Sequence, residues 1–224
     1  MNNAALARRT KEQTKTARRS VCEATVLFAD ISGFVALSRQ LGDAETFDLL
    51  DRLFTAFDAL CEWHGVEKVK TIGDGYMAVA GVRAGQTNHA ERAARLAIDM
   101  QQAALEIGDA LGLELALRIG MASGPVTTGK MGLGNQNFDI WGETVNLASR
   151  LEGQANRNIL VSDELKALID DRFEFEACEK FDIRGFGSTI AWTLVDEKTS
   201  ESAWPCVDGF SRQHTQQQTA YGTF

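Results

Sequence analysis

The sequence predicts a mixed α/β (α+β) fold built from strand hairpins and helices rather than from repeated βαβ units. Residues 21–30, VCEATVLFAD, form a mostly apolar, partly β-branched run that is typical of a buried central strand. Residues 113–121, LELALRIGM, alternate in polarity and indicate a half-buried strand. Apolar residues spaced by three and four predict a helix with Asp43 as its N-cap and Gly65 as its end. The expected buried face of this helix consists of Phe47, Leu50, Phe54, Phe57 and Cys61.

Further elements alternate along the rest of the chain. Residues 89–107 are expected to form a second long helix, whose small side chains suit close packing on a sheet. A short helix is expected near residues 162–169, and TIAWTLV at residues 189–195 is β-prone. Strands and helices therefore follow one another in the mixed order of a single α/β domain.

The composition of the chain ends differs from that of the middle. We expect one domain over residues 21–196, which is an ordinary domain size. Residues 1–20 are polar and basic and are interpreted as a solvated tail or as a linker to an unidentified regulatory partner. Residues 197–224 are rich in Gln, Ser and Thr and are expected to form a disordered C-terminal tail.

Charge and cysteine content limit the class of protein. The 23 Lys and Arg residues against 31 Asp and Glu residues give a net charge of −8, which disfavours a general nucleic-acid or anionic-membrane partner. No run approaches the ~20 apolar residues of a membrane span, and the N-terminus lacks the apolar core of a signal peptide. The four cysteines show no metal-ligand spacing, so free thiols are expected. These observations predict a cytoplasmic protein.

An aspartate between two glycines stands in a β-prone stretch, KVKTIGDGYMAV, at residues 68–79. The glycines can adopt positive φ, so Asp74 is expected at the tip of a hairpin, where an aspartate is also ordinary turn chemistry. Asp30 ends the first strand, and if the two strands are neighbours, both carboxylates meet at one edge of the sheet. Paired aspartates of this kind hold Mg²⁺ or Mn²⁺ while a substrate phosphate completes the coordination. The pair therefore suggests phosphoryl or nucleotidyl transfer.

A third stretch, FDIWGETVNLASRLE, covers residues 138–152 and is expected to be helical from Thr144 onward. Asn146 and Arg150 are four positions apart and so share one helix face. Two interpretations of this pair are open. The residues could form an ordinary polar helix surface, or they could form a site at which the amide positions a ribose and the guanidinium stabilises phosphate oxygens.

Residues 124–131, GPVTTGKM, nearly match the phosphate-binding P-loop pattern, but they are not interpreted as one. The final position is Met131, which has no hydroxyl group for a metal ion. A P-loop also leads into a helix, whereas the following MGLGNQNF is expected to be an extended loop or arm.

The three motifs together resemble those of the class III nucleotidyl cyclase catalytic domain, the adenylyl and guanylyl cyclase family. VLFADISGF resembles the first metal-aspartate motif of the family, KVKTIGDGYMAVAG the second, and FDIWGETVNLASRLE the ribose and transition-state motif. The resemblance covers roughly residues 21–196. It implies a central, mostly antiparallel sheet of the ferredoxin-like palm type with flanking helices, and a homodimer whose active sites are shared at the interface.

The resemblance also implies a metal and phosphate site near the first two motifs. Asp30 and Asp74, together with the backbone carbonyl of Ile31, would bind two Mg²⁺ or Mn²⁺ ions per active site. Gly33 and Phe34, which follow in the first motif, would contact the substrate.

Five further residues have implied roles at the nucleotide. Asn146 would orient the ribose, and Arg150 would stabilise the transition state. Arg184 stands where the family usually has a phosphate-contacting lysine, which puts the turnover rate in doubt. Lys70 and Asp139 occupy the positions that read the purine base; because Lys only donates and ionised Asp only accepts, the pair fits adenine.

The predicted activity is therefore that of an adenylate cyclase, a phosphorus–oxygen lyase of signal transduction. It would convert ATP to 3′,5′-cyclic AMP and pyrophosphate by attack of the ribose 3′-oxygen on the α-phosphorus. Alternatives are a guanylate cyclase and a weakly active, regulatory cyclase-like dimerisation module, although the module would be expected to have lost metal or ribose residues. A diguanylate cyclase is excluded because its Gly-Gly-Asp/Glu-Glu-Phe signature is absent from the sequence.

Overall fold

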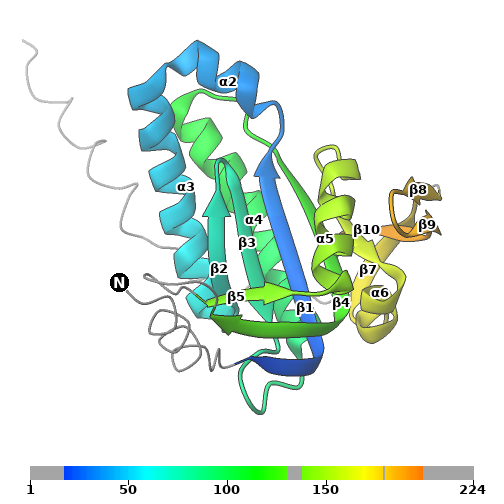
Figure 1. Ribbon diagram of the computed structural model, residues 1–224. Helices are drawn as coiled ribbons and strands as arrows, with labels where there is room; N and C mark the ends of the chain where they lie inside the picture. The colour runs from blue at the N-terminus through cyan, green and yellow to red at the C-terminus, as the bar shows by residue number, and fades with distance from the viewer. Residues whose placement is uncertain (1–17, 131–137, 179, 199–224) are drawn as a thin grey trace, which may run out of the picture.

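The computed structural model describes residues 18–130, 138–178 and 180–198, and these form a central sheet with flanking helices (Figure 1). The helices are α2 (Phe34–Leu41), α3 (Asp43–His64), α4 (His89–Leu111), α5 (Glu143–Gln154) and α6 (Asp163–Ile169). The strands are β1 (Arg19–Ile31), β2 (Glu67–Ile72), β3 (Gly75–Ala80), β4 (Leu117–Lys130), β5 (Phe138–Trp141), β6 (Ile159–Ser162), β7 (Phe173–Ala177), β8 (Phe181–Ile183), β9 (Gly187–Thr189) and β10 (Ala191–Glu197). Most of both predicted tails, and residues 131–137 of the predicted arm, lie outside the described residues.

Within the described residues, one sheet of eight strands has the order β2-β3-β1-β4-β6-β10-β7, and β5 pairs with β4. The pair β4 and β6 is parallel, and the other strand pairs of this sheet are antiparallel. Strands β8 and β9 form a separate two-stranded sheet. The predicted mixed fold with a mostly antiparallel central sheet is confirmed.

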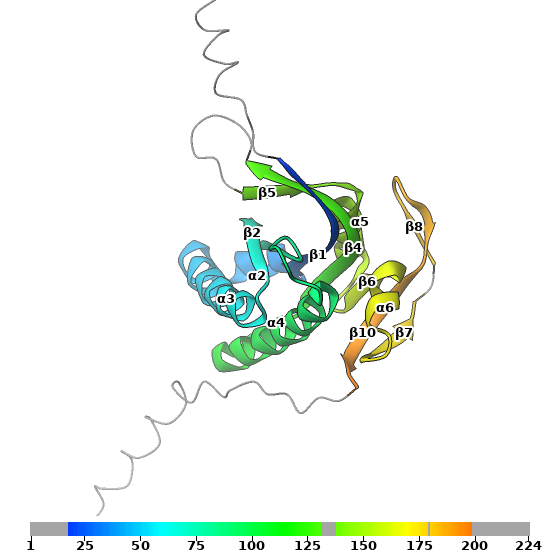
Figure 2. The same cartoon turned by 90° about the horizontal axis from the view of Figure 1, so that it is seen from below.

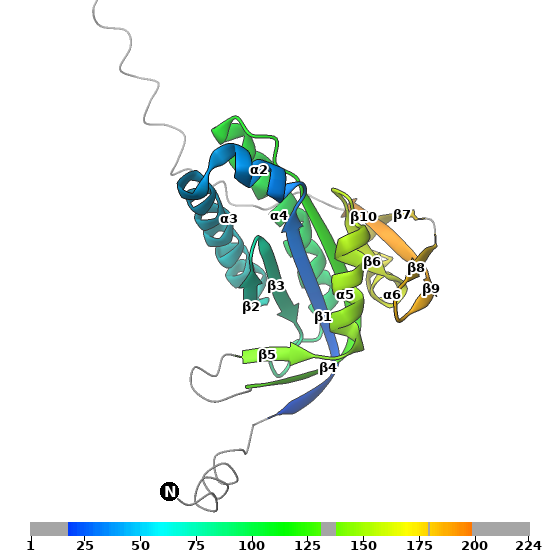
Figure 3. The ribbon, with the colours of Figure 1, turned by 45° about the horizontal axis from the view of Figure 1, so that its top comes forward.

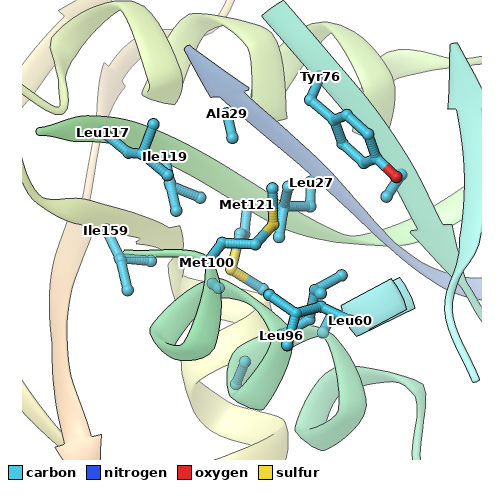
Figure 4. Close-up of a cluster of buried hydrophobic side chains, with 14 of the residues drawn as sticks. Leu27, Ala29, Leu60, Tyr76, Leu96, Met100, Leu117, Ile119, Met121 and Ile159 are labelled. Carbon is cyan, nitrogen blue, oxygen red and sulfur yellow. The ribbon is translucent and has the colours of Figure 1, made fainter. Parts of the chain in front are cut away.

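Helices cover both faces of the central sheet. Helices α3 and α4 lie together on one face (Figure 2), where Leu60, Leu96 and Met100 pack against sheet residues such as Leu27 and Met121 (Figure 4). Helix α5 lies on the other face, over a second apolar cluster that includes its own Ala148 and the strand residues Val26, Met77, Val79 and Ala122. None of the described helices has the length and apolar content that a membrane span requires.

Helix α3 differs in detail from the prediction. Its N-cap is Gly42 rather than Asp43. Phe57 and Cys61 are buried as expected, but Phe47 is 70% exposed, so the predicted buried face is wrong at that position. The buried stripe begins at Leu49, and Phe47 lies about 200° around the helix from it at 3.6 residues per turn.

Strand β4 also differs from the prediction. It begins at Leu117 rather than at residue 113 and continues to Lys130, so the P-loop-like residues 124–130 are part of a strand. The predicted alternation is present as far as Ile119, because Leu115 and Leu117 are buried while Glu114 is exposed and Arg118 is half-buried. From Gly120 to Ala122 both faces of the strand are buried, one beneath α5 and the other beneath α3 and α4. The single sequence shows the apolar alternation but not the helix that covers the second face.

Gly120 allows α5 to lie directly on β4. A Cβ atom at this position would stand 2.0 Å from the backbone nitrogen of Glu152 and 2.3 Å from the carbonyl oxygen of Ala148. We therefore expect Gly120→Ala to displace α5 and to lower the free energy of unfolding by about 3 kcal/mol, the upper end of the usual cost of overpacking. Urea unfolding monitored by circular dichroism measures this difference.

Gly153→Ala, a substitution within α5 itself, is the matched control. A Cβ atom at Gly153 meets nothing within 4 Å, so this variant should be stabilised by about 0.5–1 kcal/mol through the higher helix propensity of alanine. Equal stabilities of the Gly120→Ala protein and the wild type would show that α5 does not depend on this close approach.

Candidate active site

The pairing of β1 with β3 brings the two predicted metal aspartates to one edge of the sheet. In this register Ala29 lies opposite Tyr76, so Asp30 comes beside the β2–β3 turn that carries Asp74. Gly73 supplies the positive φ of +62° for this turn. A Cβ atom on Gly75 would lie 3.7 Å from Asp30 Oδ2, so the turn approaches the carboxylate within van der Waals contact. The expected proximity of the two aspartates is present, and their role as metal ligands stays a prediction.

The electrostatics of Asp30 are those of a carboxylate beside a second carboxylate. Partial burial raises the pKa of Asp30 to about 6, and the charge of Asp74 and a hydrogen bond with it add to the rise. The guanidinium of Arg118 opposes the rise in pKa, with 2.9 Å between its Nη2 atom and Asp30 Oδ1. Two neighbouring carboxylates, such as those of Asp30 and Asp74, provide oxygen ligands for a hard cation.

Two charged residues that the sequence analysis did not select belong to the surroundings of Asp30: Arg118 contacts Asp30, and Glu152 contacts Arg118. Arg118 Nε is 2.5 Å from Glu152 Oε1, although the two buried atoms are not aligned as a hydrogen bond. Burial raises the pKa of Glu152, while Arg118 lowers it. Each residue stands in a stretch that the sequence analysis considered: Arg118 is on the polar side of the alternating stretch, and Glu152 is the last residue of the third motif. What the sequence does not give is the approach of α5 to β4 at Gly120.

A cavity of about 450 Å³ opens beside the carboxylates. Its lining includes the predicted metal and substrate residues Asp30, Ile31, Gly33, Phe34 and Asp74. The rest of the lining is Val35, Ala36, Arg39 and Arg118. Helix α2 follows the end of β1 after a two-residue turn (Figure 3). Its residues form one wall of the cavity. The residues of the first two motifs therefore share one hollow.

Lys70 and Asp139, the predicted base-reading pair, form an ion pair elsewhere on the same protomer. The distance from Lys70 Nζ to Asp139 Oδ2 is 2.6 Å, and both side chains are partly exposed. Asp139 Oδ1 also accepts a hydrogen bond from the backbone N–H of Ile140 at 2.9 Å, which fixes the carboxylate on β5.

An irregularity in β2 directs Lys70 toward Asp139. Lys68 pairs with Ala78 and Lys70 with Met77, so the register shifts by one residue between the two lysines. Ala78 and Met77 belong to the clusters on opposite faces of the sheet. Lys68 therefore faces α3, where it contacts Asp58 at 2.7 Å, and Lys70 faces the side of α5 and β5. A regular strand would place both lysines on the same face.

The predicted ribose and phosphate residues lie outside the cavity. Asn146 and Arg150 are exposed on α5, opposite the buried positions Thr144, Ala148 and Leu151. Arg184 is exposed in the turn between β8 and β9. None of these three residues, and neither member of the base-reading pair, is among the residues that line the cavity. One protomer thus presents two separate sets of predicted site residues.

The donor set beside the cavity fits hard divalent cations. Among the described residues, no cluster of three or more His, Cys, Asp or Glu side chains forms a complete metal site. Two carboxylates with a neighbouring backbone carbonyl are the incomplete kind of ligand set that Mg²⁺ uses, because it keeps waters and takes further oxygens from substrate phosphates. Asp30, Asp74 and the carbonyl of Ile31 therefore suit such ions.

The fold and the motifs together are those of the class III nucleotidyl cyclase catalytic domain. The sequence model of the family described as the Adenylate and Guanylate cyclase catalytic domain matches residues 17–196. The chain belongs to this family. The expected extent of the domain, residues 21–196, stays a prediction.

The chain is also similar to individual curated proteins of this family. The chain is 38% identical to an adenylate cyclase of Mycobacterium tuberculosis over 179 residues, which are 80% of this chain and 40% of that protein. The chain therefore spans about 40% of the length of this curated relative.

Solved structures agree with this assignment. The guanylate cyclase domain of RhGC from Catenaria anguillulae, in complex with GTP, superposes with a TM-score of 0.77 at 31% identity, over 80% of this chain and 100% of that chain. The adenylyl cyclase CyaB from P. aeruginosa has a TM-score of 0.75 at 27% identity, over 80% of this chain and 96% of that chain.

Proposed function

We propose that the chain is an adenylate cyclase catalytic domain that converts ATP to 3′,5′-cyclic AMP and pyrophosphate. The observation that carries the choice of base is the contact of 2.6 Å between Lys70 Nζ and Asp139 Oδ2. Adenine presents an acceptor at N1 and a donor at its amino group, whereas guanine presents a donor at N1 and an acceptor at O6. An ammonium and a carboxylate side by side match adenine and leave mismatched groups with guanine.

The alternative substrate is GTP, since one of the similar structures is a guanylate cyclase domain in complex with GTP. Family members that use GTP resemble one another in having Glu and Cys where this chain has Lys70 and Asp139. If the bound base closes the site over these two side chains, a base edge that leaves polar groups unpaired costs about 1–3 kcal/mol per group, so Lys70 and Asp139 favour ATP.

The reaction would combine the two sets of residues. Asp30, Asp74 and the carbonyl of Ile31 would hold divalent metal ions, which would screen the charge on the phosphates and polarise the α-phosphorus toward attack. Asn146 would position the ribose so that its 3′-oxygen lies in line with the α-phosphorus.

Two arginines would act on the phosphates. Arg150 would donate hydrogen bonds to the oxygens that gain negative charge in the transition state. Arg184 would contact the phosphates that leave as pyrophosphate. Neither lines the carboxylate cavity of its own protomer, so we propose a two-fold homodimer in which the carboxylate cavity of one chain faces Lys70, Asp139, Asn146 and Arg150 of the other.

Product analysis tests the activity itself. The purified chain is incubated with ATP or GTP in the presence of Mg²⁺ or Mn²⁺, and the nucleotides are separated by liquid chromatography and mass spectrometry. We expect cyclic AMP from ATP at a rate above that of cyclic GMP from GTP. No cyclic product with either metal would favour the regulatory-module interpretation.

The double variant Lys70→Glu with Asp139→Cys tests the reading of the base. We expect the ratio of kcat/KM for GTP to that for ATP to rise by at least about tenfold, because Glu accepts from guanine N1 and the thiol donates weakly to O6. Lys68→Glu, on the opposite face of β2, is the matched control and should leave the ratio unchanged. If the double variant turns over and its ratio equals that of the wild type, the base is read elsewhere.

A further inference from the structure

Helix α2 presents two different sides to its surroundings. Phe34, Leu37 and Leu41, at spacings of three and four, pack against the large apolar cluster. Val35, Ala36 and Arg39, together with Phe34 at the start of the helix, line the cavity beside Asp30 and Asp74. The helix therefore holds one cationic side chain, Arg39, in the wall of the carboxylate cavity.

The two arginines of the cavity differ in their partners. Arg118 forms ion pairs with Asp30 and Glu152. Arg39 is exposed and forms no ion pair or side-chain hydrogen bond with any of the described residues. Its charge is thus available to a ligand of the cavity, whereas that of Arg118 is already balanced by carboxylates.

The position of Arg39 along α2 indicates which part of a ligand it reaches. The first turn of α2 starts three residues after Ile31, beside the carboxylates, and Arg39 lies in the last turn. At a rise of 1.5 Å per residue, Arg39 is about 9 Å along the helix from Gly33. Because helix side chains tilt toward the N-terminus, its guanidinium leans back along the cavity wall.

The simpler interpretation is a solvated arginine that interacts favourably with the C-terminal end of the helix dipole. That interpretation accounts for a cation in the last turn, but it does not require the side chain to line the cavity of the two aspartates. The lining contains two carboxylates and two guanidinium groups, and of the two guanidinium groups Arg39 is the one that pairs with no carboxylate of the described residues.

We propose that Arg39 is a further substrate-binding residue, which binds the terminal phosphate of the nucleoside triphosphate and the pyrophosphate formed from it. This assignment rests on the proposed function, since it presumes that the α-phosphate lies beside Asp30 and Asp74. A guanidinium donates two parallel hydrogen bonds to phosphate oxygens, which gives both affinity and orientation.

The test measures the binding of inorganic tripolyphosphate with Mn²⁺ to the full chain by isothermal titration calorimetry. Arg39→Gln should weaken this binding by about tenfold or more, as expected for the loss of a charge-assisted hydrogen bond. Arg39→Lys should lose less, because it keeps the charge but not the two-pronged geometry. The binding of AMP, which lacks the terminal phosphates, should be the same in all these proteins.

Arg157→Gln is the matched control, since Arg157 is an exposed arginine outside the cavity that pairs with Glu114. It should bind tripolyphosphate like the wild type. In steady-state assays Arg39→Gln should raise KM for ATP more than it lowers kcat.

Two results would overturn the assignment in distinguishable ways. If the wild type binds tripolyphosphate and Arg39→Gln binds it within twofold as tightly, Arg39 does not contact the phosphates while the proposed site stands. If the wild type itself shows no Mn²⁺-dependent binding, the metal and phosphate site proposed at Asp30 and Asp74 fails together with this assignment.

Discussion

Asp30→Asn and Asp74→Asn are each expected to lower the rate of ATP cyclisation by at least about 100-fold, because metal ions at such sites contribute several kcal/mol to transition-state stabilisation. A neutral amide is a weaker ligand for a hard cation than a carboxylate. The measurement is cyclic AMP formation by the purified variants in Mg²⁺ and in Mn²⁺. In the Asp30 variant the Arg118–Glu152 ion pair remains, so we expect the fold to persist.

The controls separate loss of metal binding from loss of structure. Asp109→Asn changes an exposed carboxyl group near the end of α4 that is not among the residues lining the cavity, and it should retain full activity. Urea unfolding of the three variants should give similar midpoints. A folded Asp30→Asn or Asp74→Asn protein that is as active as the wild type in Mn²⁺ would refute the two-aspartate metal site.

Two inactive variants, Asp30→Ala and Asn146→Ala, should restore activity when they are mixed under conditions of subunit exchange. In the proposed dimer, each active site takes its metal ligands from one chain and its ribose residue from the other. A mixed dimer then has one site with both lesions and one site with neither. Random pairing makes about half of the dimers mixed, so activity should recover to roughly a quarter of that of the wild type at equal total protein.

The mixing experiment needs an independent measure of exchange. Native mass spectrometry of one isotope-labelled variant with one unlabelled variant shows whether mixed dimers form. As a control, labelled and unlabelled samples of the Asp30→Ala protein, mixed under the same conditions, should stay inactive. If mixed dimers are present and the mixture remains as inactive as its components, the active site does not draw on both chains.

The parts of the site that depend on local sequence could be predicted. Asp74 lies in a hairpin turn because Gly73 allows a positive φ between two β-prone segments, and this is a matter of a few adjacent residues. Asp30 ends an apolar strand, which is also a local pattern. The meeting of the two aspartates followed from one assumption, that their strands are neighbours, and β1 does pair with β3.

The parts that depend on tertiary packing could not be predicted from one sequence. Arg118 and Glu152 come together only because α5 lies on β4 at Gly120, and a glycine in a strand does not say which element approaches it. The exposure of Phe47 has the same origin, since the helix pattern fits several overlapping faces and the sheet selects one of them. The residue pattern defines the elements, and their contacts define which residues become neighbours.

If Lys70 and Asp139 read the base as proposed, the register shift in β2 makes the choice of nucleotide depend on the course of the backbone as well as on side-chain identity. Lys68 and Lys70 are two positions apart and face opposite sides of the sheet only because of this shift; in a regular strand of the same length, the lysine that now meets Asp139 would face the side of α3 together with Lys68. In evolutionary terms, a substitution elsewhere in β2 that removes the irregularity could abolish the proposed recognition of adenine while every recognition residue remains encoded. Aligned lysines and aspartates in a gene do not by themselves guarantee the same substrate.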